Sequence, residues 1–186
     1  MKTIAVKKEK ISIKAKTLWI VAVIVSAVAL PQIMHFLGII SGLETALGEV
    51  FLPMHLPVIL AGFLAGPAVG AIAGLFAPLI SHSLTAMPSA ALLPFMTAEL
   101  CIYGLCAGLL KDVNVSDIIK VLAVQIVGRG VRAVLIVISV YLIHISSINV
   151  NIIWLSIKSG IIGIILQLVL IPLILYRVKG LKENEQ

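Results

Sequence analysis

Charged and aromatic side chains are scarce in this sequence. Asp, Glu, Lys and Arg together make up 12% of the 186 residues and Phe, Tyr and Trp make up 5%, whereas 61% are hydrophobic. The mean hydropathy is +1.19. Soluble domains carry about 25% charged and about 45–50% apolar residues. The shortage of charge therefore excludes a soluble catalytic or nucleotide-binding domain and indicates an integral membrane protein.

Residues that build metal and catalytic centres are also few. The two cysteines, Cys101 and Cys106, are five positions apart in one apolar stretch and so lie on different helix faces, which predicts packing roles and disfavours a disulfide or CxxC site. The four histidines form no HExxH or HxH motif, and no nucleophile elbow or phosphate-binding glycine loop is present. We expect no metal, no cofactor and no catalytic residue in this chain.

Long apolar runs occupy most of the chain and predict an all-α membrane protein with six transmembrane helices. The second and third are short and meet at Gly66-Pro67, so they are either tilted spans or a re-entrant hairpin. We expect one membrane domain at 17–176, between a basic segment at 1–16 and a tail at 177–186. The six helices are expected at about 17–40, 53–66, 67–84, 89–110, 117–144 and 151–176.

Lys and Arg gather at alternate ends of the predicted spans. They precede the first span, flank the connection between the fourth and fifth, and follow the sixth, whereas the connections at about 41–52, 85–88 and 145–150 contain neither. Because cytoplasmic flanks retain positive charge, both termini are expected in the cytoplasm. The net charge of +6 then reflects this asymmetry and the anionic lipid beside it, and it does not indicate nucleic-acid binding.

A cleaved signal peptide is the alternative for the first span. The basic start and the apolar run from Leu18 lead to Ala27-Val28-Ala29, which imitates a cleavage site. The basic start is long for the n-region of a signal peptide, however, and the apolar run continues past the candidate cleavage site. We therefore expect the first span to be retained.

Small residues recur at helical spacing. Gly62, Gly66, Gly70 and Gly74 are four positions apart, and so are Gly104 and Gly108. Such spacing lets helix backbones approach closely in lipid, so these glycines predict helix packing. In the first helix, Ala22 and Ser26 have the same spacing.

Polar residues inside the predicted spans are the candidates for a site, because charge there is costly and persists where it faces a cavity or a partner. On each of three helices they share one face, and we expect these faces to turn toward one another. They are Glu99 and Tyr103 on the fourth helix, Gln125, Arg129 and Arg132 on the fifth, and Asn151, Trp154 and Lys158 on the sixth.

The charges on these faces do not balance. One carboxylate, Glu99, accompanies three cations, Arg129, Arg132 and Lys158. One ion pair neutralises one cation, so the imbalance favours a ligand with negative charge. The alternative is that one arginine pairs with Glu99 while the other cations snorkel to lipid headgroups or reach a neighbouring subunit.

Histidine residues are all expected near the extracellular side, where neutral imidazole is an acceptable boundary group. His55 differs from the other three because Pro53 and Pro57 fix the backbone around it. We interpret Met54 and His55 as lining the mouth of a cavity.

A family resemblance is carried by residues 52–110, which read LPMHLPVILAGFLAGPAVGAIAGLFAPLISHSLTAMPSAALLPFMTAELCIYGLCAGLL. This block, the basic start, the six spans and the long connection after the first span resemble the substrate-binding S components of energy-coupling factor (ECF) vitamin transporters. The resemblance covers nearly the whole chain and is densest in PVILAGFLAGPAVGAIAG and TAMPSAALLPFMTAEL.

The resemblance implies a function and partners. It implies capture of a micronutrient near the extracellular side of a bacterial plasma membrane, under Ser41–Leu52 and Thr85–Pro88. It also implies a transmembrane coupling subunit and two cytoplasmic ATPases that use ATP. The family docks on the coupling subunit through an Ala-x-x-x-Ala motif, whose nearest match here is Ala22 and Ser26.

Together these interpretations predict a site for one small polar molecule. Arg129 and Lys158 would take an anionic or carbonyl group, and Glu99 a hydroxyl, amine or ring N–H. Trp154 or Tyr103 would cover an apolar face. The other expected members are Met54, His55, Gln125 and Asn151. Unpaired cations suit pantothenate, whereas a mixed carboxylate, imidazole and cation site suits a heteroaromatic vitamin such as pyridoxine.

Two other classes of function stay open at this point. A membrane assembly or regulatory protein whose buried charges pair with a partner's helix would bind no small molecule. An ion-coupled transporter usually has inverted repeats with broken helices in both halves, whereas Pro and Gly breaks are concentrated here in the first half.

Overall fold

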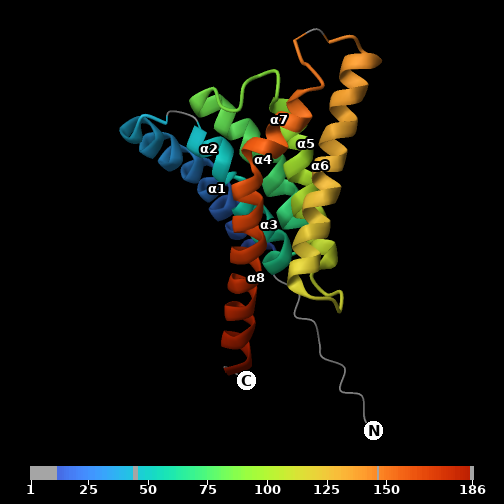
Figure 1. Ribbon diagram of the computed structural model, residues 1–186. Helices are drawn as coiled ribbons and strands as arrows, with labels where there is room; N and C mark the ends of the chain where they lie inside the picture. The colour runs from blue at the N-terminus through green and yellow to red at the C-terminus, as the bar shows by residue number, and fades with distance from the viewer. Residues whose placement is uncertain (1–11, 44–45, 146, 185–186) are drawn as a thin grey trace.

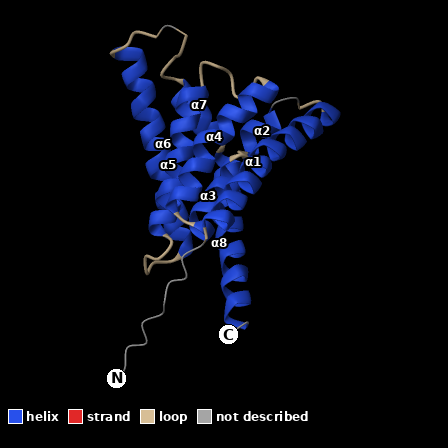
Figure 2. Ribbon diagram, turned by 180° about the vertical axis from the view of Figure 1, so that it is seen from behind, coloured by secondary structure: helices blue, strands red, loops and turns tan. Residues whose placement is uncertain are grey.

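The computed structural model describes residues 12–43, 46–145 and 147–184, and the regular structure in these ranges is entirely helical (Figures 1 and 2). The basic start at 1–11 lies outside the described residues. The predicted all-α class is confirmed for the described part of the chain. Its helices are α1 (Ile13–Ser41), α2 (Ala46–Phe51), α3 (His55–Ala65), α4 (Pro67–Thr85), α5 (Leu93–Leu110), α6 (Asp117–Tyr141), α7 (Ile152–Ser159) and α8 (Ile161–Asn184).

Five of the described helices, α1, α4, α5, α6 and α8, are long and apolar enough to cross a membrane. The chain is therefore a multi-pass helical membrane protein. The remaining apolar helix of intermediate length is α3, whose 11 residues reach only about 16 Å. His55 at the start of α3 and Ser81 near the end of α4 line the same cavity, so the chain reverses direction at Gly66 between the two helices.

The expected single helix at 151–176 is instead two helices that meet at Gly160. The side chain of Leu52 packs against this glycine, where an added Cβ would lie 2.9 Å from Leu52 Cδ1. Gly163 is covered in the same way by the backbone of α2 at Val50 and Phe51. The short helix α2, which hydropathy alone did not predict, thus packs on the junction of α7 and α8. Helix α8 also continues through most of the expected tail.

The tightest packing joins α5 to α3 and α4 through glycines. Gly70 faces Gly104 so closely that a Cβ on either residue would overlap the backbone of the other. Gly74 packs in the same way on the Leu100 carbonyl, and Gly108 on the Gly66-Pro67 turn. The predicted packing role of these small residues is confirmed.

Helix α1 lies at the edge of the bundle and leans away from it toward its C-terminal end (Figure 1). It packs on α4 and α3 through Val23 and Ala27, which are buried. Ala22 and Ser26 lie on its exposed side, where Ser26 Oγ donates a hydrogen bond to the Ala22 carbonyl at 2.8 Å. Neither member of this pair is therefore buried against another described helix.

Ion pairs join the beginning of α6 to the C-terminal part of α8. Lys179 Nζ lies 2.7 Å from Asp117 Oδ2, and Lys120 Nζ lies 3.3 Å from Asp117 Oδ1. Ser116 caps α6 by accepting a hydrogen bond from the Ile119 amide. The beginning of α1, the α5–α6 connection and the end of α8 lie toward the same end of the bundle (Figure 1).

We predict that Gly104→Ala destabilises the protein, because the added Cβ overlaps the Gly70 backbone and neither helix can move without separating. Overpacking of this kind costs about 1–3 kcal/mol. The apparent melting temperature of the purified protein in detergent should fall accordingly. Gly130→Ala is the matched control, since nothing lies within 4 Å of a Cβ at that position of α6. Equal melting temperatures for the two variants would contradict the packing described here.

Candidate functional site

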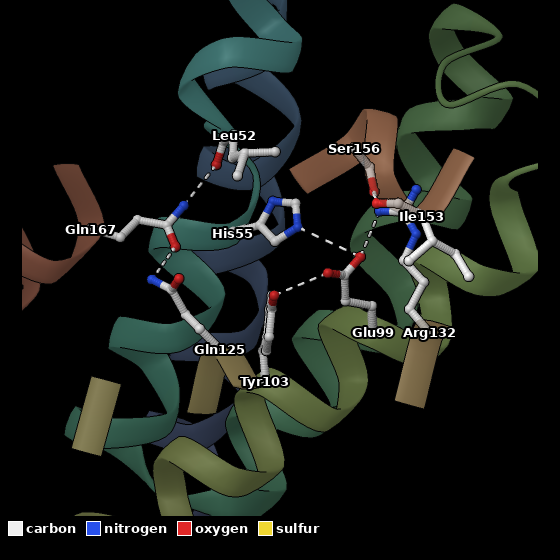
Figure 3. Close-up of polar contacts among 9 residues, drawn as sticks. All are labelled: Leu52, His55, Glu99, Tyr103, Gln125, Arg132, Ile153, Ser156 and Gln167. Carbon is white, nitrogen blue, oxygen red and sulfur yellow. Dashed lines mark hydrogen bonds and ion pairs between the residues drawn. The ribbon is translucent and has the colours of Figure 1, made fainter. Parts of the chain in front are cut away.

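A fully buried carboxylate, Glu99 of α5, lies at the centre of the polar residues (Figure 3). One turn along the same helix, the Tyr103 hydroxyl donates a hydrogen bond to Glu99 Oε1 at 2.9 Å. From α6, Arg132 Nη1 donates to Glu99 Oε2, also at 2.9 Å. Gly128 leaves the space into which the Tyr103 ring fits, since a Cβ there would overlap the ring. Both carboxylate oxygens are thus engaged within the bundle.

His55, the first residue of α3, adds an imidazole to the same cluster. Its Nε2 lies 3.9 Å from Glu99 Oε2, and its ring packs at a tilt on the Tyr103 ring with centroids 5.4 Å apart. The residue is 1% exposed, and neither ring nitrogen has a hydrogen-bond partner among the described residues. Pro57 fits in the first turn of α3, where a missing N–H costs no helical hydrogen bond. The start of α3 therefore holds the imidazole beside the carboxylate.

A cavity of about 390 Å³, called here the main cavity, opens above this cluster. Met54 and His55 line it, together with parts of both expected connections: Gly48 and Leu52 from the first and Met87 and Pro88 from the second. Glu99 and Tyr103 do not line the main cavity. Glu99 instead contacts His55 and Arg132, which do line it, and so helps to position these two side chains. Other polar groups in its wall are His35, Ser81, Ser89, Arg132, Ser156 and Ser159.

An outer hollow of about 520 Å³ adjoins the main cavity. The two share Ser89, Leu92, Ile152 and Leu155, so these side chains form the partition between them. Asn151 lines only the outer hollow. The partition is formed by α7 and by the segment that leads into α5.

A second set of polar contacts, called here the amide chain, connects α6, α8 and the turn at Leu52 (Figure 3). Gln125 Nε2 of α6 donates to Gln167 Oε1 of α8 at 3.4 Å, and Gln167 Nε2 donates to the Leu52 carbonyl at 3.4 Å. Gln125 and Gln167 are buried. Leu52 has a positive φ of 50°, an uncommon backbone conformation for this residue type. The two amides thus support the turn that precedes Met54 and His55.

The predicted site residues fall into four groups. Met54, His55, Glu99 and Tyr103 come together at the main cavity or directly beneath it, and Gln125 belongs to the amide chain. Arg129 lines a separate small hollow between α6 and α7. The structure does not bring Asn151, Trp154 or Lys158 into the main cavity; these side chains are exposed, and Trp154 is 67% exposed.

The rotation of α7 explains why the expected face of the sixth helix is not the one that lines the main cavity. The residues of α7 that line it are Ile152, Leu155, Ser156 and Ser159, which share one helical face. Trp154 and Lys158 lie beside this face and point elsewhere. Because α7 ends at Gly160, its rotation is independent of that of α8.

Sequence reasoning missed several contributors to the site, among them Ser81, Ser156 and Gln167. Ser81 and Ser156 are small hydroxyl residues of a kind that is common in membrane helices, so nothing distinguished them beforehand. Gln167 did carry a signal, because it is the one amide side chain between positions 161 and 176. A buried amide in an apolar helix needs a hydrogen-bond partner, which points to a neighbouring polar residue.

We predict that Glu99 and Arg132 are energetically coupled. Arg132→Gln or Glu99→Gln alone should destabilise the protein by about 3–5 kcal/mol, because each leaves one buried charge uncompensated. The double variant should lose much less than the sum of the two single losses. Thermal unfolding of the four proteins in detergent measures this coupling. Additive losses would mean that the two charges do not stabilise each other.

Comparison with known proteins adds no relative to this description. The chain matches no family model, no curated protein and no solved structure. The Glu99 cluster and the main cavity are therefore the basis for the function proposed next.

Proposed function

We propose that this protein is the substrate-binding subunit of an ECF-type importer, which captures a small water-soluble vitamin in the main cavity. The observation that carries the proposal is that His55 and Arg132 both line the main cavity beside the buried Glu99, which pairs with Arg132 at 2.9 Å and lies 3.9 Å from His55 Nε2. These two side chains place an imidazole and a guanidinium in the wall of a cavity within an otherwise apolar bundle. The cavity volume of about 390 Å³ also falls within the usual range of small-molecule sites, about 300–1,000 Å³.

Unpaired polar atoms at the cavity support a polar ligand. The two ring nitrogens of His55 and the hydroxyl of Ser81 are buried and have no hydrogen-bond partner among the described residues. A buried polar group without a partner costs about 1–3 kcal/mol. A ligand that carries hydroxyl, carbonyl or ring-nitrogen groups would satisfy these atoms.

Different residues of the main cavity would contact the polar and the apolar parts of the ligand. His55 and Ser81 would hydrogen-bond the polar groups of the ligand, while Met54, Met96 and Leu92 cover its apolar part. Glu99 is a positioning residue, because Tyr103 and Arg132 already engage its two oxygens. Pantothenate-like and pyridoxine-like molecules are the favoured ligands.

Partners would supply the energy for uptake, because the sequence has no phosphate-binding glycine loop of its own. ATP would be hydrolysed by two cytoplasmic ATPases joined to a transmembrane coupling subunit. The exposed Ala22 and Ser26 of α1 are the proposed docking position for that subunit. Because Glu99 and Arg132 pair within the chain, their charges do not require a partner's helix, which weighs against a purely assembly function.

The proposed topology has six spans, counting α3, with both termini in the cytoplasm of a bacterial cell. The main cavity would then face the extracellular side. Lysines and arginines at the start of α1, near the α5–α6 connection and at the end of α8 support this orientation.

We predict that the purified full-length protein releases one tightly bound micronutrient on denaturation, identified by mass spectrometry. Tryptophan fluorescence should then report its rebinding, since Trp154 lies on α7 next to the cavity residue Leu155. His55→Asn should weaken binding at least about tenfold, the loss expected from one good hydrogen bond. His144→Asn, at an exposed position, is the matched control.

Either of two results would contradict the proposed function. One is the absence of any bound or binding micronutrient in a protein that remains folded and monodisperse. The other is ligand affinity that His55→Asn leaves equal to that of the His144→Asn control.

We predict opposite membrane sides for two connections. In a Cys101→Ala/Cys106→Ala background, Ser147→Cys should react with a membrane-impermeant thiol reagent added to intact cells. Asn114→Cys, in the α5–α6 connection, should react only after the cells are permeabilised. Both positions are exposed in the structure. The reverse pattern of labelling would place the main cavity on the cytoplasmic side.

A further inference from the structure

A second, smaller hollow of about 190 Å³ lies between α6 and α7. Arg129 and Arg132 line it from α6, and Ile153, Ser156 and Ile157 line it from α7. We call it the arginine hollow. Arg132 and Ser156 also line the main cavity, so the two spaces adjoin at these side chains.

The charge around this hollow is unbalanced. Between positions 50 and 111 the only acidic residue is Glu99, and between 118 and 176 there is none. Arg132 pairs with Glu99, whose other oxygen accepts from Tyr103. The Nε atoms of Arg129 and Arg132 are buried and have no hydrogen-bond partner in the described part of the chain. Arg129 therefore adds one positive charge that no carboxylate of these segments offsets.

Snorkelling to the membrane surface does not account for Arg129. It is twelve residues from each end of α6, which corresponds to about 18 Å along the helix in either direction. An arginine side chain is much shorter than that distance. A cation held at this depth is costly unless an anion or a water-filled space accompanies it.

We infer that the molecule bound by this protein carries a single negative charge, a carboxylate, which lies in the arginine hollow while the remainder of the molecule fills the main cavity. This inference rests on the proposed function. The planar guanidinium groups present paired N–H donors that match a carboxylate, and the two arginines approach it from one helix face. One anion would balance the charge that Arg129 adds to these segments beyond the Glu99–Arg132 pair, so a monocarboxylate fits better than a neutral or cationic ligand.

This assignment separates the two kinds of ligand left open above. A pantothenate-like acid has the required carboxylate, and a pyridoxine-like neutral compound does not. Lys158, which is exposed on α7, has no part in the anion subsite. Arg132 lines both the main cavity and the arginine hollow. Its Nη1 donates to Glu99, whereas its Nε has no hydrogen-bond partner among the described residues.

Matched acid and neutral compounds test the inference on the full-length protein in detergent. Suitable probes are pantothenate against pantothenol and nicotinate against nicotinamide, measured by calorimetry, together with any compound that co-purifies. The acid of at least one pair should bind roughly tenfold or more tightly than its neutral partner. Arg129→Gln should abolish that preference, and the binding of the neutral partner that remains shows that the variant is folded.

Two further variants sharpen the test. Arg177→Gln removes the same charge from an exposed position near the end of α8 and should preserve the preference for the acid. Arg129→Lys keeps the charge but loses the planar donor pair, and it should retain only part of the preference.

The outcomes distinguish the inference from the proposed function. A micronutrient that binds without acid preference, or whose preference survives Arg129→Gln, overturns the carboxylate subsite and leaves the binding function standing. No binding of any micronutrient overturns both. If native mass spectrometry instead finds a phospholipid that is lost in Arg129→Gln while micronutrient affinity is unchanged, the anion is a lipid headgroup and the subsite inference is again overturned.

Discussion

The interaction on which the site depends is the burial of the Glu99 carboxylate. A carboxylate without solvent contact inside an apolar bundle is stable only when its oxygens are hydrogen-bonded and its charge is paired. Tyr103 supplies a hydroxyl from the same helix, whereas the Arg132 guanidinium must come from α6 and the His55 ring from α3. Three helices are therefore required to meet at one level, and that level becomes the floor of the main cavity.

Glycine packing is what allows this meeting. Lipid offers no hydrophobic driving force between helices, so close backbone contact is a principal source of stability in such bundles. Gly70 and Gly104 bring α4 and α5 together, and Gly128 admits the Tyr103 ring between α5 and α6. Helix α7 is only eight residues long and has no buried residue, so it packs loosely. The hollows beside it occur where the glycine contacts end.

The sequence predicted the elements better than their rotation. Hydropathy located most helix boundaries within a few residues, and the cost of buried charge identified Glu99 as central. Hydropathy did not predict the break at Gly160, because the apolar run continues across it and the Leu52 side chain that packs there is distant in the sequence. A helix surrounded by lipid also lacks the polar outer face that would fix its rotation. For that reason the polar pattern predicts a cavity face at Trp154 and Lys158, whereas the residues that line the cavity include Leu155 and Ser159, one position further on.

The shortness of α3 has a consequence for how the chain enters the membrane during synthesis. At about 16 Å it covers only about half of a hydrocarbon core of about 30 Å, too little to be released into lipid by itself. Pro67 begins α4 directly after Gly66, so the two helices must leave the translocation channel as one unit. Their glycine faces then have no partner until α5 has been made. The glycine contacts that join α3 and α4 to α5 can therefore form only after the chain has been made as far as residue 110.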